Sequence, residues 1–125
     1  MKKHHLHIVL PWPNKALAPN VRCHWAIKYR ASKAAHRTAH FETFHKMEGC
    51  RASPVGKIDV RLSFYPPDKR RRDEDNMIAS MKHYLDGIAH GLRVDDRNFH
   101  LLEPFIGEPV DGGCVHADLF WKGEH

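Results

Sequence analysis

A run of four basic residues, Lys69, Arg70, Arg71 and Arg72, lies directly before two aspartates that are two positions apart, Asp73 and Asp75. Cationic side chains attract a phosphate backbone, whereas neighbouring carboxylates are costly to hold together unless a divalent cation such as Mg²⁺ lies among them. Hydrolysis of a phosphodiester needs an activated water and neutralised charge on the phosphorus, and a carboxylate-bound metal can supply both. The segment therefore favours a nuclease site over its alternative, a solvated charged loop before a helix.

A third oxygen ligand is available from Asp95 or Asp96, which follow a predicted helix of about sixteen residues, roughly 24 Å long. In an extended stretch Asp73 and Asp75 point to the same side, so all three carboxylates meet if the chain turns back across a sheet. Other uses of an Asp-x-Asp pair are weaker. Nucleotide-sugar transferases need a larger nucleotide-binding domain, and an EF-hand needs a Gly and a Glu at spacings that this segment lacks.

The composition indicates one globular domain with an acidic partner. A chain of 125 residues is long enough for one core and too short for two independent ones. Its net charge of +5 favours a polyanion, and nucleic acid is the expected one because further bases occur at Lys28, Arg30, Lys33 and Arg37. So small a chain is expected to need a partner subunit for a large ligand.

Three cysteines without a CxxC pair signal neither a disulfide framework nor a thiolate zinc site, which fits a reducing cytoplasm. No segment is long and apolar enough to be a signal sequence or a membrane span. Twelve histidines invite a metal interpretation, but His5 and His7 alternate with apolar residues and are expected on the wet face of a strand.

Hydrophobic periodicity predicts the elements that position these residues. Residues 3–10 read as a strand ended by prolines, and residues 25–47 read as a long basic helix with a loose apolar stripe. That stripe comprises Ile27, Ala31, Ala34, Phe41 and Phe44. Residues 57–65 alternate strictly and predict a strand, after which residues 74–90 have helical spacing, with Gly91 expected to close the helix.

The C-terminal third is expected to be a hairpin. A weak strand over residues 101–106 is followed by the turn signal Asp111-Gly112-Gly113 and by a second strand in which apolar residues alternate from Val115 to Trp121. In this scheme the basic run lies in a loop from a strand end to a helix, and Asp75 lies in the first turn of that helix.

Three stretches of the chain resemble the RusA family of Holliday junction resolvases, endodeoxyribonucleases of phages and prophages. They are Leu10-Pro11-Trp12-Pro13, then Arg70-Arg71-Arg72-Asp73-Glu74-Asp75-Asn76, and then Val94-Asp95-Asp96. Their order and approximate spacing span nearly the whole chain. The central motif, a basic run followed by Asp-x-Asp-Asn, is the discriminating one.

The resemblance implies an α+β fold, with a small mixed β-sheet of about four strands packed with two main helices. It also implies a homodimer that binds four-way DNA junctions and cuts two strands of like polarity with Mg²⁺, for which Mn²⁺ is a possible substitute. Asp73 and Asp75 match the family's paired metal-binding aspartates, and Asp96 matches the third. Arg72 matches the basic residue implicated in engaging DNA, and Asn76 is expected to fix the start of the helix.

One position departs from the family pattern. The family's catalytic lysine lies four residues after the second aspartate, where this chain has Ala79. Lys82 lies three residues further, on roughly the same helix face, and is the candidate replacement, against the alternative of an ordinary exposed lysine. The displaced lysine also leaves open a non-catalytic DNA-binding module, and a less structure-selective nuclease is a third possibility.

Residues before the long helix are further candidates for DNA contact. Asn20, Arg22, His24 and Trp25 lie in a polar and aromatic segment that suits phosphate contacts and base stacking. Trp12, between its prolines, is expected to be a core plug instead.

Overall fold

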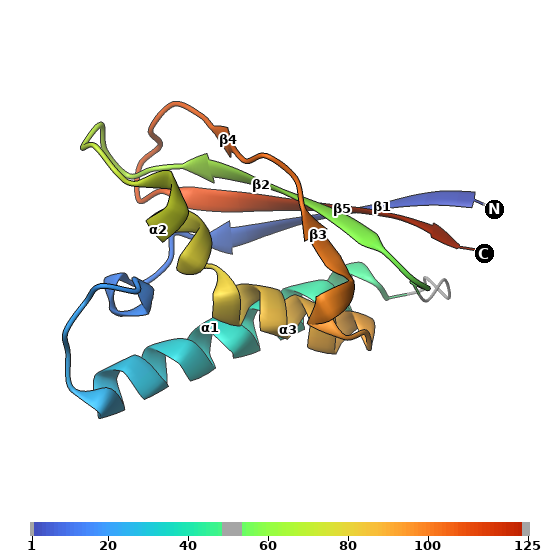
Figure 1. The fold of residues 1–125 in the computed structure, drawn as a ribbon, viewed down its shortest axis with the longest axis horizontal. Helices are drawn as coiled ribbons and strands as arrows, with labels where there is room; N and C mark the ends of the chain where they lie inside the picture. The colour runs from blue at the N-terminus through green and yellow to red at the C-terminus, as the bar shows by residue number, and fades with distance from the viewer. Residues whose placement is uncertain (1, 49–53, 124–125) are drawn as a thin grey trace.

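A mixed sheet and the helices packed on one of its faces make up the structure, a computed structural model that describes residues 2–48 and 54–123 (Figure 1). Within those residues the sheet has five strands: β1 (Lys2–Pro11), β2 (Ile58–Tyr65), β3 (Phe99–Leu101), β4 (Phe105–Ile106) and β5 (Cys114–Gly123). Three α-helices accompany them in the described ranges: α1 (Trp25–Lys46), α2 (Glu74–Ala79) and α3 (Lys82–Leu92). The predicted α+β class is confirmed.

The strand order is β1-β5-β2-β3, with β4 also paired to β2. β5 runs antiparallel to both β1 and β2, whereas β3 and β4 run parallel to β2. The predicted C-terminal hairpin is therefore wrong, because β4 adds to the outer edge of β2 and β5 inserts between β1 and β2. The turn at Asp111–Gly113 is present, but it carries the chain across β2 to that central position.

Strict alternation in the strands builds the core. Ile58, Val60, Leu62 and Phe64 of β2 are buried, and so are the alternate residues Val115 to Trp121 of β5. These side chains meet the buried faces of α1 and α3 in one hydrophobic cluster. The sequence prediction of which β2 and β5 residues face inward is confirmed.

The predicted apolar stripe of α1 is wrong at its large residues. Ile27, Phe41 and Phe44 are exposed. The buried residues of α1 are smaller and four apart: Ala31, Ala35, Ala39 and Thr43. This face of α1 has small residues because α3 packs closely against it through glycines. A Cβ added at Gly87 would lie 2.9 Å from the Ala39 Cβ.

The predicted helix over residues 74–90 is two helices. α2 ends at Ala79 and α3 begins at Lys82. At the break, the Ser80 hydroxyl donates to the Asn76 carbonyl at 2.8 Å, a local bond that competes with continuing the helix.

The sequence predicts that Gly91 ends the helix, and this prediction is wrong. α3 continues to Leu92, and Arg93 ends it in the left-handed conformation with φ of 60°. Gly91 instead lies against α1, where an added Cβ would meet the Thr43 side chain at 2.8 Å. Its lack of a side chain serves helix packing.

Two sequence expectations concern the class of protein. Cys23 and Cys114 are free thiols, and Cys50 lies outside the described residues. Within the described residues, no helix combines the length and the apolar character needed to cross a membrane.

Candidate functional site

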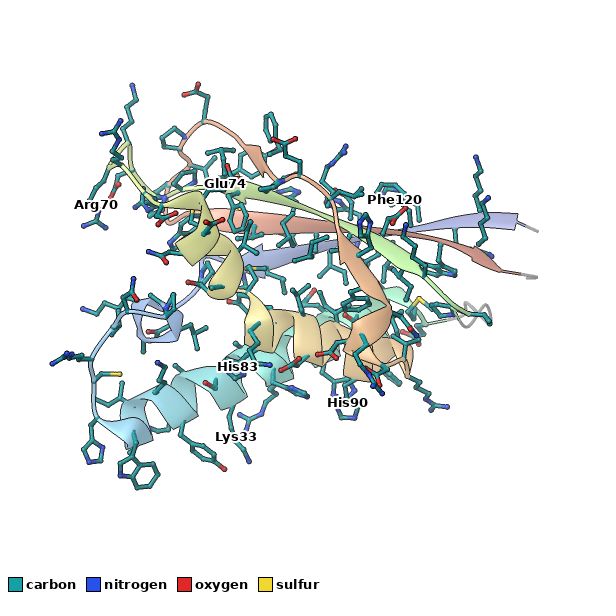
Figure 2. The ribbon with its side chains drawn as sticks, viewed as in Figure 1. Lys33, Arg70, Glu74, His83, His90 and Phe120 are labelled. Carbon is teal, nitrogen blue, oxygen red and sulfur yellow. The ribbon has the colours of Figure 1, made fainter. Side chains whose placement is uncertain are left out.

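The loop between β2 and α2 presents the cationic run. Lys69, Arg70 and Arg71 are exposed, and Figure 2 shows Arg70 projecting outward at the tip of this loop. Pro66 and Pro67 end β2 because proline cannot donate to a ladder, so the run begins where the sheet stops. Lys69, Arg70 and Arg71 are named here the cationic loop.

Arg72 has a different environment from its three neighbours. Its side chain is only 15% exposed, and its guanidinium donates to the Asp68 and Arg70 carbonyls at 3.2 and 2.9 Å and to Asp68 Oδ1 at 2.9 Å. Its Cζ also lies 5.4 Å from the centroid of the Trp12 ring. Arg72 therefore holds the loop in shape, and Trp12, half-buried against Phe64, supports it as the expected core plug.

Asp73 is the N-cap of α2, and its Oδ1 accepts from the Asp75 backbone amide at 3.0 Å. Asp75 lies in the first turn, where the helix dipole favours a carboxylate. The expectation that the two aspartates share one side of an extended stretch is wrong, because only Asp73 has extended backbone and Asp75 is already helical. Both carboxylates are exposed at the base of the cationic loop.

An open cleft of about 590 Å³ adjoins this helix start. Trp12, Arg70, Arg72, Asp73 and Asn76 are among the residues that line it. Asn76 does not fix the helix start as expected, because Asp73 is the cap. Its place in the cleft lining keeps it available to a ligand.

A second acidic pair lies further along the chain. Asp86 of α3 and Asp96, at the start of the 3₁₀ turn η2 (Asp96–Asn98), approach each other. A side-chain hydrogen bond with Asp86 raises the pKa of Asp96, and burial and the like charge of Asp86 add to the rise. Lys82 Nζ lies 3.5 Å from Asp86 Oδ2, one helical turn away. Sequence reasoning missed Asp86, although its i, i+4 spacing from Lys82 was a usable signal.

Asp95 interacts with Asp96, but its main partner is Arg97. It caps η2, accepts from the Arg97 amide at 2.9 Å and forms an ion pair with the Arg97 guanidinium at 2.9 Å. These hydrogen bonds from Arg97 lower the pKa of Asp95 to about 2. Of the two candidates for the third ligand, Asp96 is the one without an arginine partner of this kind.

The predicted meeting of Asp73, Asp75 and Asp96 is not found in the described residues, where no three histidine, cysteine or acidic side chains form a group suited to one metal ion. Asp96 interacts with Asp86 of α3, whereas Asp73 and Asp75 lie at the start of the separate helix α2. Two separate acidic pairs therefore take the place of one three-ligand cluster.

The remaining candidates lie before and on α1. Asn20 and Arg22 are exposed in the segment that leads to α1. His24 is the N-cap of α1, accepting from the Ala26 amide at 3.1 Å, so its ring has a structural role. Trp25 is exposed and available to a ligand.

Histidines gather at two places outside these acidic pairs. Between α1 and α3, His36 Nε2 lies 3.1 Å from His90 Nδ1, and the ring of His40 stacks on that of His90 with centroids 4.0 Å apart. On the sheet face away from the helices, His5 Nε2 and His7 Nδ1 contact one oxygen of Asp118 at 2.7 and 2.8 Å.

The exposed position of His5 and the half-buried position of His7 confirm that they lie on the wet face of a strand. Burial works against the Asp118 carboxylate, but hydrogen bonds from His7 and His5 lower its pKa overall. These histidines therefore have a carboxylate partner within the fold.

No protein-family model matches the sequence. Thiamine-monophosphate kinase from Stenotrophomonas maltophilia K279a aligns with 95% of this chain, which spans only 31% of the kinase chain, at a TM-score of 0.41 and 12% identity. That score is too low to establish a shared fold.

An uncharacterized protein of Xylella fastidiosa (strain Temecula1) is 41% identical over 104 residues, which are 82% of this chain and 67% of the relative. Identity at that level over most of both chains shows common descent. The chain belongs to the same family as this Xylella fastidiosa protein.

Proposed function

We propose that the protein is a Mg²⁺-dependent endodeoxyribonuclease that resolves four-way DNA junctions by paired, symmetric phosphodiester hydrolysis. The observation that carries the proposal is the cationic loop standing directly beside Asp73, the cap of α2, at the rim of an open cleft. A DNA-binding surface alone gains nothing from carboxylates beside the phosphate backbone. Their placement among arginines is what a hydrolytic site requires.

The cationic loop and the cleft have separate tasks in this proposal. The exposed side chains of Lys69, Arg70 and Arg71 attract the backbone, and Arg72 keeps the loop in place through Asp68. Asn76 offers an uncharged hydrogen-bonding group in the cleft lining. Lys82, which is exposed and pairs only loosely with Asp86, is available to a phosphate oxygen.

The donor set fits Mg²⁺ bound by one or two carboxylates and does not fit one three-ligand ion. Mg²⁺ is usually bound by one or two carboxylates, with water and substrate phosphate filling the other positions. Asp86 and Asp96 interact with each other and can supply two such carboxylates, while Asp73 and Asp75 are exposed carboxylates at the start of α2 that can each supply one. When bound, the metal would supply an activated water and neutralise charge on the phosphate.

A homodimer follows from the substrate. A junction has approximate two-fold symmetry, and two identical sites in a two-fold dimer match the two incisions. We place the protein in the cytoplasm, where the thiols Cys23 and Cys114 stay reduced. Equilibrium sedimentation at rising protein concentration checks the dimer, and a monomer throughout would contradict it.

The second candidate is a DNA-binding module of the same ancestry that does not cut. The absence of a three-ligand group among the described residues favours it. A less structure-selective nuclease acting on flaps or single strands is distinguished by its substrates alone.

One experiment separates the three. A synthetic four-way junction, a flap and a linear duplex are incubated with protein and Mg²⁺ or Mn²⁺, and the products are mapped. The proposal predicts matching incisions in opposite arms of the junction, with 5′-phosphate and 3′-hydroxyl ends, and an intact duplex. Binding of the junction without cleavage in either metal, over several junction sequences, would replace the proposal with the binding module.

A further inference from the structure

A second hollow lies outside the acidic site, along the first half of α1. It has a volume of about 710 Å³. Its lining consists of Trp25, Lys28, Tyr29, Ser32, Lys33 and His36 of α1 with His83 of α3. Figure 2 labels two of these residues, Lys33 on α1 and His83 on α3. This hollow is called here the α1 groove.

Aromatic rings in the α1 groove are open to solvent. Trp25 is 73% exposed and Tyr29 is 54% exposed, and they are four residues apart, one turn along the same helix face. The packing of α1 does not require them, because its buried face is formed by the alanines and Thr43. Exposed rings one turn apart on a helix each offer a face on which flat, apolar groups can stack.

The charge of the α1 groove is positive. Lys28 and Lys33 line it, and among the residues that the structure describes no acidic one does. Lys33 Nζ lies 5.3 Å from the centroid of the Tyr29 ring. Lys33 lies over one face of the Tyr29 ring, which leaves the other face for a base and a cation beside it for a phosphate.

Charged residues of both α1 and α3 act on His83 in the α1 groove. Burial lowers the pKa of His83, Asp86 opposes that shift, and the charges of Lys82, His36 and Lys28 reinforce it. The neutral form of His83 is therefore favoured beside the cations supplied by α1. Because Asp86 follows His83 by one turn of α3, the α1 groove adjoins the second acidic pair.

We propose that the α1 groove binds an unpaired segment of nucleic acid, with bases stacked on Trp25 and Tyr29 and phosphates held by Lys28 and Lys33. Unpaired nucleotides are the ligand because only they offer free base faces to exposed rings, whereas a duplex hides them. The inference rests on the proposed function in taking DNA as the polyanion. It adds that the protein holds single-stranded nucleotides, such as those at a branch, apart from the cationic loop.

The test measures binding without cleavage. Fluorescence anisotropy with a labelled oligothymidylate of about 10 nucleotides and a duplex of equal length, both in chelator, reports single-strand affinity. Trp25→Ala and Lys28→Glu should each weaken oligothymidylate binding about tenfold, and Trp25→Phe, which keeps a stacking ring, should retain most of it. Phe44→Ala and Lys46→Glu, at the other end of α1, are matched controls and should change it less than about twofold.

The outcomes separate this inference from the proposed function. Oligothymidylate binding by Trp25→Ala and Lys28→Glu at the native affinity would overturn the inference. So would a shift of these variants from dimer to monomer in sedimentation with unchanged DNA affinity, because α1 would then be a subunit contact. A junction left uncut by a protein that still binds oligothymidylate through Trp25 would contradict the nuclease alone.

Discussion

Asp86 of α3 lies close enough to Asp96 of η2 to raise the pKa of Asp96, chiefly through hydrogen bonding between the two carboxyl groups. Asp86→Asn removes one negative charge and should lower that pKa, which a carboxyl carbon NMR titration measures residue by residue. Mg²⁺ should lower it in the native protein as well, because a bound cation favours the ionised form. A titration of Asp96 that does not respond to Mg²⁺ would show that this pair holds no ion.

The raised pKa also has a consequence for stability. A folded carboxyl whose pKa lies above its unfolded value of 3.8 binds protons more tightly in the folded state. Its contribution to the free energy of unfolding is therefore present below the unfolded pKa and is lost as the pH rises through the folded pKa. Asp86→Asn should flatten this part of the pH dependence, measured by urea unfolding across pH 3 to 6, roughly the range in which carboxyls titrate.

The histidines between α1 and α3 predict the opposite dependence. Burial lowers the pKa of His40, and the charges of His90 and His36 lower it further. Stability should therefore fall as the pH drops below 6.5, the unfolded value, towards the folded pKa. His40→Gln should reduce the difference between urea midpoints at about pH 7.5 and about pH 5.5. An unchanged difference would show that other groups dominate.

Substitution of Arg72 should affect stability, whereas substitution of its neighbour Arg71 should affect DNA binding. Arg72→Ala removes three hydrogen bonds to the loop and should lower the free energy of unfolding by about 1 kcal/mol, a value reduced for partial exposure. Arg71→Ala should leave stability unchanged but weaken DNA binding and reduce its salt slope by about 1. Thermal unfolding and anisotropy at several salt concentrations check both. Equal stability of the two variants would contradict the assigned roles.

Gly87→Ala tests the close approach of α1 and α3 by its sign. Helix propensity alone would stabilise α3 by up to about 1 kcal/mol. The added Cβ, however, would meet the backbone carbonyl of His36 and lie 2.9 Å from the Ala39 Cβ. We expect a net loss of about 1–3 kcal/mol in the free energy of unfolding, measured in urea. A more stable variant would show that the helices part easily.

Local patterns predicted the elements well and their long-range partners poorly. Alternation located β1, β2 and β5 and their buried sides, because one face of each strand meets the core. Nothing in residues 99–106 indicates whether they pair with β5 or with the edge of β2. In the structure they pair with β2, as β3 and β4. The predicted apolar stripe on α1 is wrong because large apolar residues suggest a buried face, whereas the buried face of α1 consists mainly of alanines.

At the candidate site, too, the sequence predicts local features well and long-range contacts poorly. The sequence predicts the position of the cationic loop and Asp73 between a strand end and a helix, since prolines and helical spacing are local signals, and the structure confirms it. The break near Ser80 and the partnership of Asp86 with Asp96 depend on the packing of α3 and η2, which spacing does not reveal. The structure accordingly divides the expected acidic cluster into two pairs.

Cleavage of a four-way junction by the native protein and Asp75→Asn is the most direct test of the central claim. Asp75→Asn keeps the side-chain shape and removes a charge, and Glu74→Gln, on the preceding residue of α2 (Figure 2), is the matched control. We predict that Asp75→Asn binds the junction normally and cuts it at least ~100-fold more slowly in Mg²⁺, while Glu74→Gln stays near native. Cleavage of the junction by Asp75→Asn at the rate of the native protein would contradict the proposed role of Asp75 in metal-dependent hydrolysis.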